Sequence, residues 1–264
     1  MWRMEEHILD TPYMKKATTR KVRVYLPYTY DVNVEHYPVI YFHDGKAVFY
    51  GKTDFGTGSF EVLDTVTKME QEQKIKGCII VAIDNAREER SDEYLPFINS
   101  NQNGFQEGHY GGKAGDYADF VVNQLKPFID TQYRTIPEQS SIIGSSMGGL
   151  VTAFIISKYP DVFEKAGILS IASWVYNEGE WLNYLQQSSP NKTMKYYIQV
   201  GTDEGHLPSD YTLAQRYIDD TLSYYQTLIS LGVPVSNIKL RIGVGDKHSE
   251  TTWSNYIEDF ILYN

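Results

Sequence analysis

Ser146 lies at the centre of GSSMG (residues 144–148), which matches the pattern Gly-x-Ser-x-Gly. Ser145 does not match it, because Ile143 and Met147 would have to be the glycines. In this pattern a strand turns sharply into a helix and exposes a serine held in a strained backbone conformation. The alternatives are a glycine-rich turn without chemistry and a turn that binds phosphate, but no lysine follows the glycines as a P-loop requires. The pattern predicts Ser146 as a nucleophile.

A serine hydroxyl is a weak nucleophile and needs a base in contact with it. The pattern implies the chain order serine, acid, histidine, and only His206 and His248 follow Ser146. His248 comes directly after the last predicted strand, at the edge where a base must lie. A base at His206 would leave no strand end between it and the serine to supply an acid. We therefore predict His248 as the base; an exposed loop histidine is the alternative.

The acid that orients the imidazole should follow the strand predicted at residues 195–201. Asp203 and Glu204 both lie there. Spacing alone cannot separate two adjacent carboxylates, so both remain candidates.

Strands and helices alternate along the chain and must position these groups. Residues 21–27 alternate polar and apolar side chains, as in a half-exposed antiparallel strand. Most of the other predicted strands are nearly continuous apolar runs, typical of strands covered on both faces; they are residues 38–44, 77–84, 140–145, 166–173, 195–201 and 239–245. Helical spacing recurs over residues 117–129 and 213–229, and a closing helix is expected over 252–262. These patterns predict one α/β domain over residues 1–264, with a mostly parallel sheet between two layers of helices and antiparallel strands near the N-terminus. In such a sheet, ligands bind at the carboxyl ends of the strands.

Five segments together resemble the esterase-D-like family of α/β-hydrolases, which includes enterochelin (trilactone) esterases, feruloyl esterases, formylglutathione hydrolases and mycolyltransferases. They are residues 39–49, 111–135, 144–150, 200–205 and 248–253. The resemblance implies an α/β-hydrolase fold and an acid at the fourth position of Gly-Thr-x-Asp/Glu, which favours Glu204 over Asp203. It also implies an oxyanion hole built from the backbone N–H groups of Lys46 and Met147. The "HDG" segment at residues 43–45 is equally compatible with a plain turn.

The predicted substrate pocket lies in the loops after the strands. The long segment 84–112 carries Arg87, Arg90, Tyr94 and His109, and Trp174 follows another strand. The alternative is that these arginines pair with neighbouring carboxylates; the candidates are Glu88, Glu89, Asp92 and Glu93. Residues 43–51 lack the cysteine-bearing loop of formylglutathione hydrolases, so the resemblance favours the siderophore and carbohydrate-ester branches.

The net charge of −10, without a lysine or arginine run, argues against a nucleic-acid partner. No apolar run approaches the length of a membrane helix, and the first ten residues do not resemble a signal peptide. No His/Cys cluster has metal-ligand spacing, and the proposed chemistry needs no cofactor. The sequence thus predicts a cytoplasmic serine esterase that acts on a small or medium ester through an acyl-enzyme. An acyltransferase and a non-catalytic binding module are the alternatives; the oligomeric state is not predicted.

Overall fold

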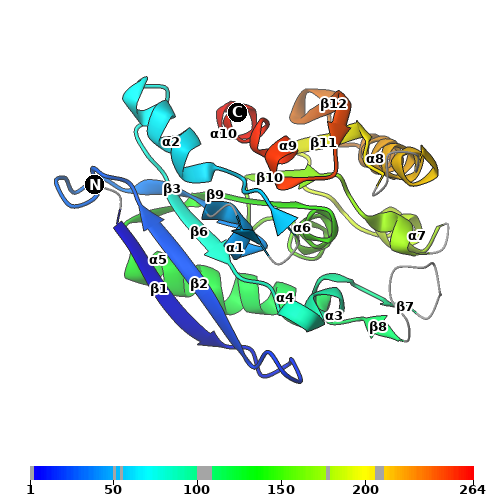
Figure 1. The fold of residues 1–264 in the computed structure, drawn as a ribbon, viewed down its shortest axis with the longest axis horizontal. Coiled ribbons are helices and arrows are strands. Elements are labelled where there is room, and N and C mark those ends of the chain that lie inside the picture. The colour runs from blue at the N-terminus through cyan, green and yellow to red at the C-terminus, as the bar shows by residue number, and fades with distance from the viewer. Residues whose placement is uncertain (1–2, 50–51, 54–55, 100–108, 177–178, 206–210) are drawn as a thin grey trace.

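The computed structural model describes residues 3–49, 52–53, 56–99, 109–176, 179–205 and 211–264 (Figure 1). Within these ranges eight strands form one sheet, in the order β1-β2-β6-β3-β9-β10-β11-β12. Their bounds are β1 Arg3–Asp10, β2 Thr19–Leu26, β3 Tyr37–Phe42, β6 Ile79–Ile83, β9 Thr135–Ser145, β10 Lys165–Leu169, β11 Lys195–Asp203 and β12 Ile238–Lys247. Two short ribbons join β4 (Lys52–Thr53) to β5 (Gly56–Thr57) and β7 (Ile98–Asn99) to β8 (Tyr110–Gly111).

The pairing of the strands confirms the predicted sheet. β1 with β2 and β2 with β6 are antiparallel, and every pair from β6 to β12 is parallel. β1 was not anticipated. It is an edge strand on which no residue is fully buried, and Ile8 is 60% exposed. Its sequence therefore carries no apolar run that would reveal it.

Helices pack on both faces of the sheet (Figure 1). The helices are α1 Gly45–Phe49, α2 Val62–Gln71, α3 Arg90–Tyr94, α4 Ala114–Phe120, α5 Lys126–Gln132, α6 Met147–Lys158, α7 Glu180–Gln186, α8 Tyr211–Ser230, α9 Glu250–Ser254 and α10 Ile257–Leu262. A π-helical turn, η2 (Val121–Leu125), joins α4 to α5, and short 3₁₀ turns are η1 Arg87–Glu89, η3 Ser173–Val175 and η4 Val235–Asn237. The expected closing helix is two short helices, α9 and α10.

Strand side chains alternate between two hydrophobic clusters. Tyr41 belongs to the cluster that includes residues of α4, α6 and α8, whereas its neighbours Ile40 and Phe42 belong to the cluster that includes residues of α1, α2, α9 and α10. Ile142 and Ile143 divide in the same way. This period of two is the reason that a strand covered on both faces reads as a continuous apolar run.

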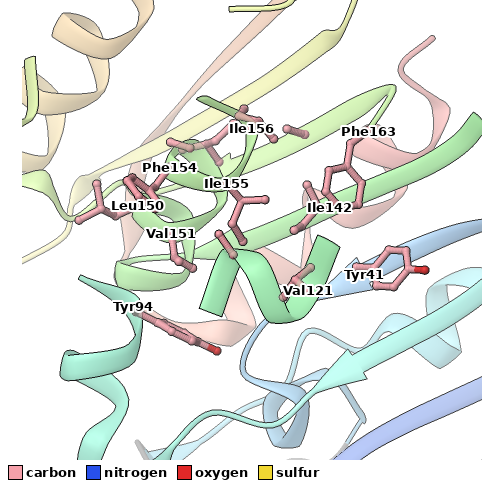
Figure 2. Packing of buried hydrophobic residues seen from close by; sticks show 14 of the residues in the cluster. Tyr41, Tyr94, Val121, Ile142, Leu150, Val151, Phe154, Ile155, Ile156 and Phe163 are labelled. Atoms are coloured by element: carbon pink, nitrogen blue, oxygen red, sulfur yellow. The ribbon is translucent and has the colours of Figure 1, made fainter. Parts of the chain in front are cut away.

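Helix α6 is apolar all round because it lies inside one helical layer. Every residue from Met147 to Ile156 is buried. Figure 2 shows Val151 and Ile155 of α6 beside Ile142 of β9 and Val121 of η2. A helix packed on all sides fixes the position of the residue at its N-terminus, which here is Ser146. Within the described ranges, no helix combines the length and apolar character needed to cross a bilayer.

Candidate active site

Ser146 joins β9 to α6 in a backbone conformation that few residues with a Cβ adopt. Its φ and ψ are 59° and −125°, and such strain collects at functional sites. The Ser146 N–H donates to the carbonyl of Leu169 at 2.9 Å, and the Ala172 N–H donates to the Ser146 carbonyl at 3.3 Å. These bonds fasten the turn to the carboxyl end of β10. The sharp strand-to-helix turn expected at Ser146 is present.

The glycines on either side of Ser146 are required by close packing. A Cβ on Gly144 would lie 2.5 Å from the carbonyl oxygen of Gly148, and one on Gly149 would lie 2.8 Å from that of Leu169. Both obstacles are backbone atoms, which cannot rotate away as a side chain can. The close approach of β9, α6 and β10 therefore explains Gly144 and Gly149, whereas a Cβ on Gly148, the second glycine of the pattern, would meet the Asp44 side chain.

Glu204 and His248 follow directly on β11 and β12, which are adjacent parallel strands. His248 Nδ1 lies 2.6 Å from Glu204 Oε2, and the Glu204 side chain is fully buried. With Nδ1 donating to the carboxylate, Nε2 carries the lone pair and can accept a proton. The pair therefore has the arrangement of a general base and the acid that orients it.

Three groups fix the other side of this pair. Ser170 Oγ and the Gly201 N–H each donate to Glu204 Oε1 at 2.6 Å. Trp253 Nε1 donates to Ser170 Oγ at 2.8 Å, so the serine proton is directed at the carboxylate. The Trp253 ring also meets the His248 imidazole edge-on, with centroids 4.8 Å apart. The carboxylate and the imidazole are thus held by one connected network.

Tyr217 of α8 lies against His248, near Ser146. Its hydroxyl lies 3.4 Å from His248 Nε2, and its ring packs on the imidazole with centroids 4.7 Å apart. The Trp174 ring packs edge-on against the Tyr217 ring, with centroids 5.7 Å apart, and the Ser146 side chain is close enough to lower the pKa of the Tyr217 hydroxyl. Sequence reasoning used Tyr217 only as an apolar position of a helix. Nothing in the sequence distinguishes it from the other 21 tyrosines, because the contacts come from a distant helix.

The remaining acid and base candidates are placed differently. Asp203 is the last residue of β11, half-buried and paired through its backbone with Lys247. Within the described ranges its side chain makes no hydrogen bond or ion pair with His248, whereas Glu204 does. His206 lies outside the described residues.

The two predicted oxyanion residues belong to the first turns of α1 and α6. Lys46 is the second residue of α1, and Met147 is the first residue of α6. N–H groups in the first turn of a helix have no acceptor within that helix, so they are suited to bind an oxygen. A Cβ on Gly148 would lie 3.1 Å from Asp44 Oδ2. The turn before α1 and the start of α6 are therefore neighbours.

Arg90 and Tyr94, both predicted to line a substrate pocket, are inside the protein against the turn at Asp44. The Arg90 guanidinium binds the Asp44 carboxylate at two points, 2.7 and 2.8 Å, and Asn85 Nδ2 adds a third bond at 2.7 Å. The Asp44 N–H donates to the hydroxyl of Tyr94, which has no exposed surface. Burial alone would raise the pKa of Asp44, but Arg90 outweighs it and holds the pKa below its ordinary value. The Arg90 and Tyr94 side chains are both buried and support the turn, whose backbone φ at Asp44 is 53°.

The other three predicted pocket residues reach the surface. Arg87 is exposed and lines a cavity of about 440 Å³ that Lys46 also lines. Trp174 is half-buried and lines a second cavity, of about 530 Å³, together with Trp181. His109 is exposed. Among the residues described, no three His, Cys, Asp or Glu side chains gather closely enough to hold a metal ion.

Comparison with known families and proteins places this geometry in context. Residues 14–223 match the family described as "Putative esterase". The protein named "Uncharacterized protein YbbA" of Bacillus subtilis is 27% identical over 236 residues, which are 88% of this chain and 87% of that one.

Two solved structures share the architecture. The siderophore hydrolase EstA from Aspergillus nidulans has a TM-score of 0.76 at 17% identity and is matched over 98% of this chain and 94% of its own. The IroE-like serine hydrolase from Shewanella oneidensis has a TM-score of 0.71 at 20% identity, over 98% and 79%. These matches identify the fold as that of the α/β-hydrolases, as the sequence resemblance implied.

Proposed function

The chain belongs to the "Putative esterase" family, and on this basis we propose that it hydrolyses carboxylic esters with a triad of Ser146, His248 and Glu204. Membership of the family makes the protein an esterase. The observation that carries the triad is the 2.6 Å contact between His248 Nδ1 and Glu204 Oε2. Tyr217 supports it, because its hydroxyl lies 3.4 Å from Nε2 of that imidazole and the Ser146 side chain is close enough to lower its pKa.

In the first half of the reaction Ser146 Oγ attacks the ester carbonyl while His248 Nε2 takes its proton. Glu204 holds the imidazole in the reactive tautomer and stabilises the imidazolium that forms. The N–H groups of Lys46 and Met147 bind the oxyanion, where each such donor is worth about 3 kcal/mol. His248 then returns the proton to the leaving alcohol.

In the second half, water repeats the sequence on the acyl-enzyme. His248 accepts a proton from the water as it attacks, and then protonates Ser146 Oγ as the acid departs. The protein returns to its starting state with no group oxidised or reduced.

The substrate we propose is a small or medium ester: a siderophore trilactone, a carbohydrate ester or a simple acyl ester. Support comes from relatives of the same fold, one described as a siderophore hydrolase and another as a ferulic acid esterase. We further propose that the chain acts as one α/β domain, and in the cytoplasm. The first is supported by a sheet whose two faces carry one cluster each.

The test is hydrolysis of short-chain p-nitrophenyl esters by the wild type and by Ser146→Ala. We expect a loss in kcat of at least about 10³-fold, because the nucleophile of a triad acts as a unit with its base. Ser145→Ala is the matched control: this neighbouring serine is buried, whereas Ser146 is half-buried, and it precedes the turn. Labelling with a fluorophosphonate probe, followed by mapping of the modified peptide, should place the adduct on Ser146.

Full activity in Ser146→Ala, or an adduct elsewhere, would contradict the proposal. A panel of feruloyl, acetyl-sugar and trilactone esters then ranks the substrate classes. Product analysis with water and a sugar alcohol in competition separates a hydrolase from an acyltransferase.

A further inference from the structure

The Tyr217 hydroxyl is the polar group on α8 that reaches the reacting atoms. It lies 3.4 Å from His248 Nε2, and the side chains of Trp174 and Ser146 are close enough to oppose the rise in its pKa that burial causes. The Trp174 ring packs edge-on against the Tyr217 ring, with centroids 5.7 Å apart. Only 1% of Tyr217 is exposed, so solvent does not compete for these contacts. A hydroxyl held in this position needs an explanation beyond packing, since Phe would fill the same space.

The donors and acceptors around this hydroxyl determine where its proton points. His248 Nδ1 faces the Glu204 carboxylate and carries the imidazole proton there, so Nε2 can only accept. The Tyr217 hydroxyl therefore points its proton toward Nε2. Burial raises the pKa of Tyr217, so the phenol keeps this proton throughout the neutral pH range.

The leaving oxygen of an ester must come to the same place. During collapse of the tetrahedral intermediate it accepts the proton of His248 Nε2, at hydrogen-bond distance from that nitrogen. The Tyr217 hydroxyl already lies beside Nε2 and beside Ser146, to which the leaving oxygen is joined through the tetrahedral carbon. The proposed oxyanion donors, Lys46 and Met147, are backbone groups on other helices.

We propose that Tyr217 donates a hydrogen bond to the leaving-group oxygen as the ester C–O bond breaks, and to the attacking water in the second half of the reaction. This inference rests on the proposed function. The proton that is transferred to the leaving alcohol comes from His248. Tyr217 keeps its phenol proton and supplies only a hydrogen bond that stabilises the negative charge developing on the leaving oxygen. Trp174 acts as the positioning residue, because its ring packs edge-on against the ring of Tyr217.

The test compares Tyr217→Phe with the wild type on two esters of one acid, p-nitrophenyl butyrate and ethyl butyrate. p-Nitrophenolate departs readily without help, whereas an alkoxide needs its charge stabilised. We expect kcat/KM for the ethyl ester to fall about tenfold, as for loss of a hydrogen bond to a charged group, and for the p-nitrophenyl ester to change less than about threefold. Tyr224→Phe is the matched control, because it removes a buried hydroxyl from the same helix.

The ratio of the two kcat/KM values separates the outcomes. An equal fall for both esters would mean a structural role, and no fall for either would mean no role; each overturns the inference. Thermal unfolding of both variants checks that the fold is intact. If Ser146→Ala is inactive while Tyr217→Phe treats both esters alike, the inference fails and the proposed function stands. If Ser146→Ala retains activity, the proposed function itself fails.

Discussion

Replacement of Glu204 by Gln tests the orientation of the base more sharply than replacement by Ala. Alanine would leave a cavity and two buried donors without an acceptor, so a loss of activity could reflect a loss of structure. Glutamine keeps the shape of the side chain and one carbonyl oxygen. The question is then which end of the amide faces His248.

The hydrogen bonds in the structure answer that question. Ser170 Oγ and the Gly201 N–H both donate to Oε1, so the amide oxygen of Gln must take that place. The amide nitrogen then takes the place of Oε2, facing His248 Nδ1. An N–H in that place forces Nδ1 to accept, which moves the imidazole proton to Nε2 and leaves no lone pair for Ser146.

A base locked in the wrong tautomer should lower kcat/KM by about 10³- to 10⁴-fold, equivalent to about 4–5.5 kcal/mol of transition-state stabilisation. The assay is initial-rate hydrolysis of p-nitrophenyl butyrate, with thermal unfolding to verify the fold. Asp203→Asn is the matched control, and we expect it to change kcat/KM less than about threefold. Two results would refute the reasoning. One is a Glu204→Gln variant that retains more than a tenth of wild-type kcat/KM; the other is an Asp203→Asn variant whose kcat/KM falls as much as that of Glu204→Gln.

Two further predictions concern stability. Gly144→Ala would bring a Cβ to 2.5 Å from the Gly148 carbonyl oxygen, so we expect a loss of at least about 3 kcal/mol in the free energy of unfolding. Gly115→Ala is the control: its Cβ would meet only a side-chain nitrogen at 3.9 Å, so the free energy of unfolding should not fall. Equal urea midpoints for the two variants would contradict the first prediction. Burial raises the pKa of Glu70 from about 4.5 to about 7, and neither carboxylate oxygen has a hydrogen-bond partner among the described residues. The unfolded chain therefore ionises this group first, and the folded state loses stability as the pH rises from about 4.5 to 7. Glu70→Gln should raise the free energy of unfolding by about 2 kcal/mol more at pH 8 than at pH 5; this value is reduced because the side chain is only partly buried. The same gain in stability at both pH values would exclude this explanation.

Local patterns predicted the features that depend on local physics. A strand covered on both faces must be apolar along its length. Continuous apolar runs in the sequence therefore predicted β3, β6, β9, β10 and β11. The turn at Ser146 could be found because its first glycine, Gly144, stands where backbone atoms approach to within 3 Å and leave no room for a Cβ. Chain order and strand ends then predicted His248 and the pair Asp203 and Glu204. β1 was not predicted, because an edge strand with exposed side chains need not be apolar along its length.

Only the tertiary structure could decide contacts between segments far apart in the chain. It placed Glu204, rather than Asp203, in hydrogen-bond contact with His248. It also placed Ser170 against the Glu204 carboxylate and Trp253 against Ser170. It also placed Tyr217 beside the imidazole. A residue's neighbours along the chain fix its local conformation, but its partners across the sheet depend on how whole strands and helices pack.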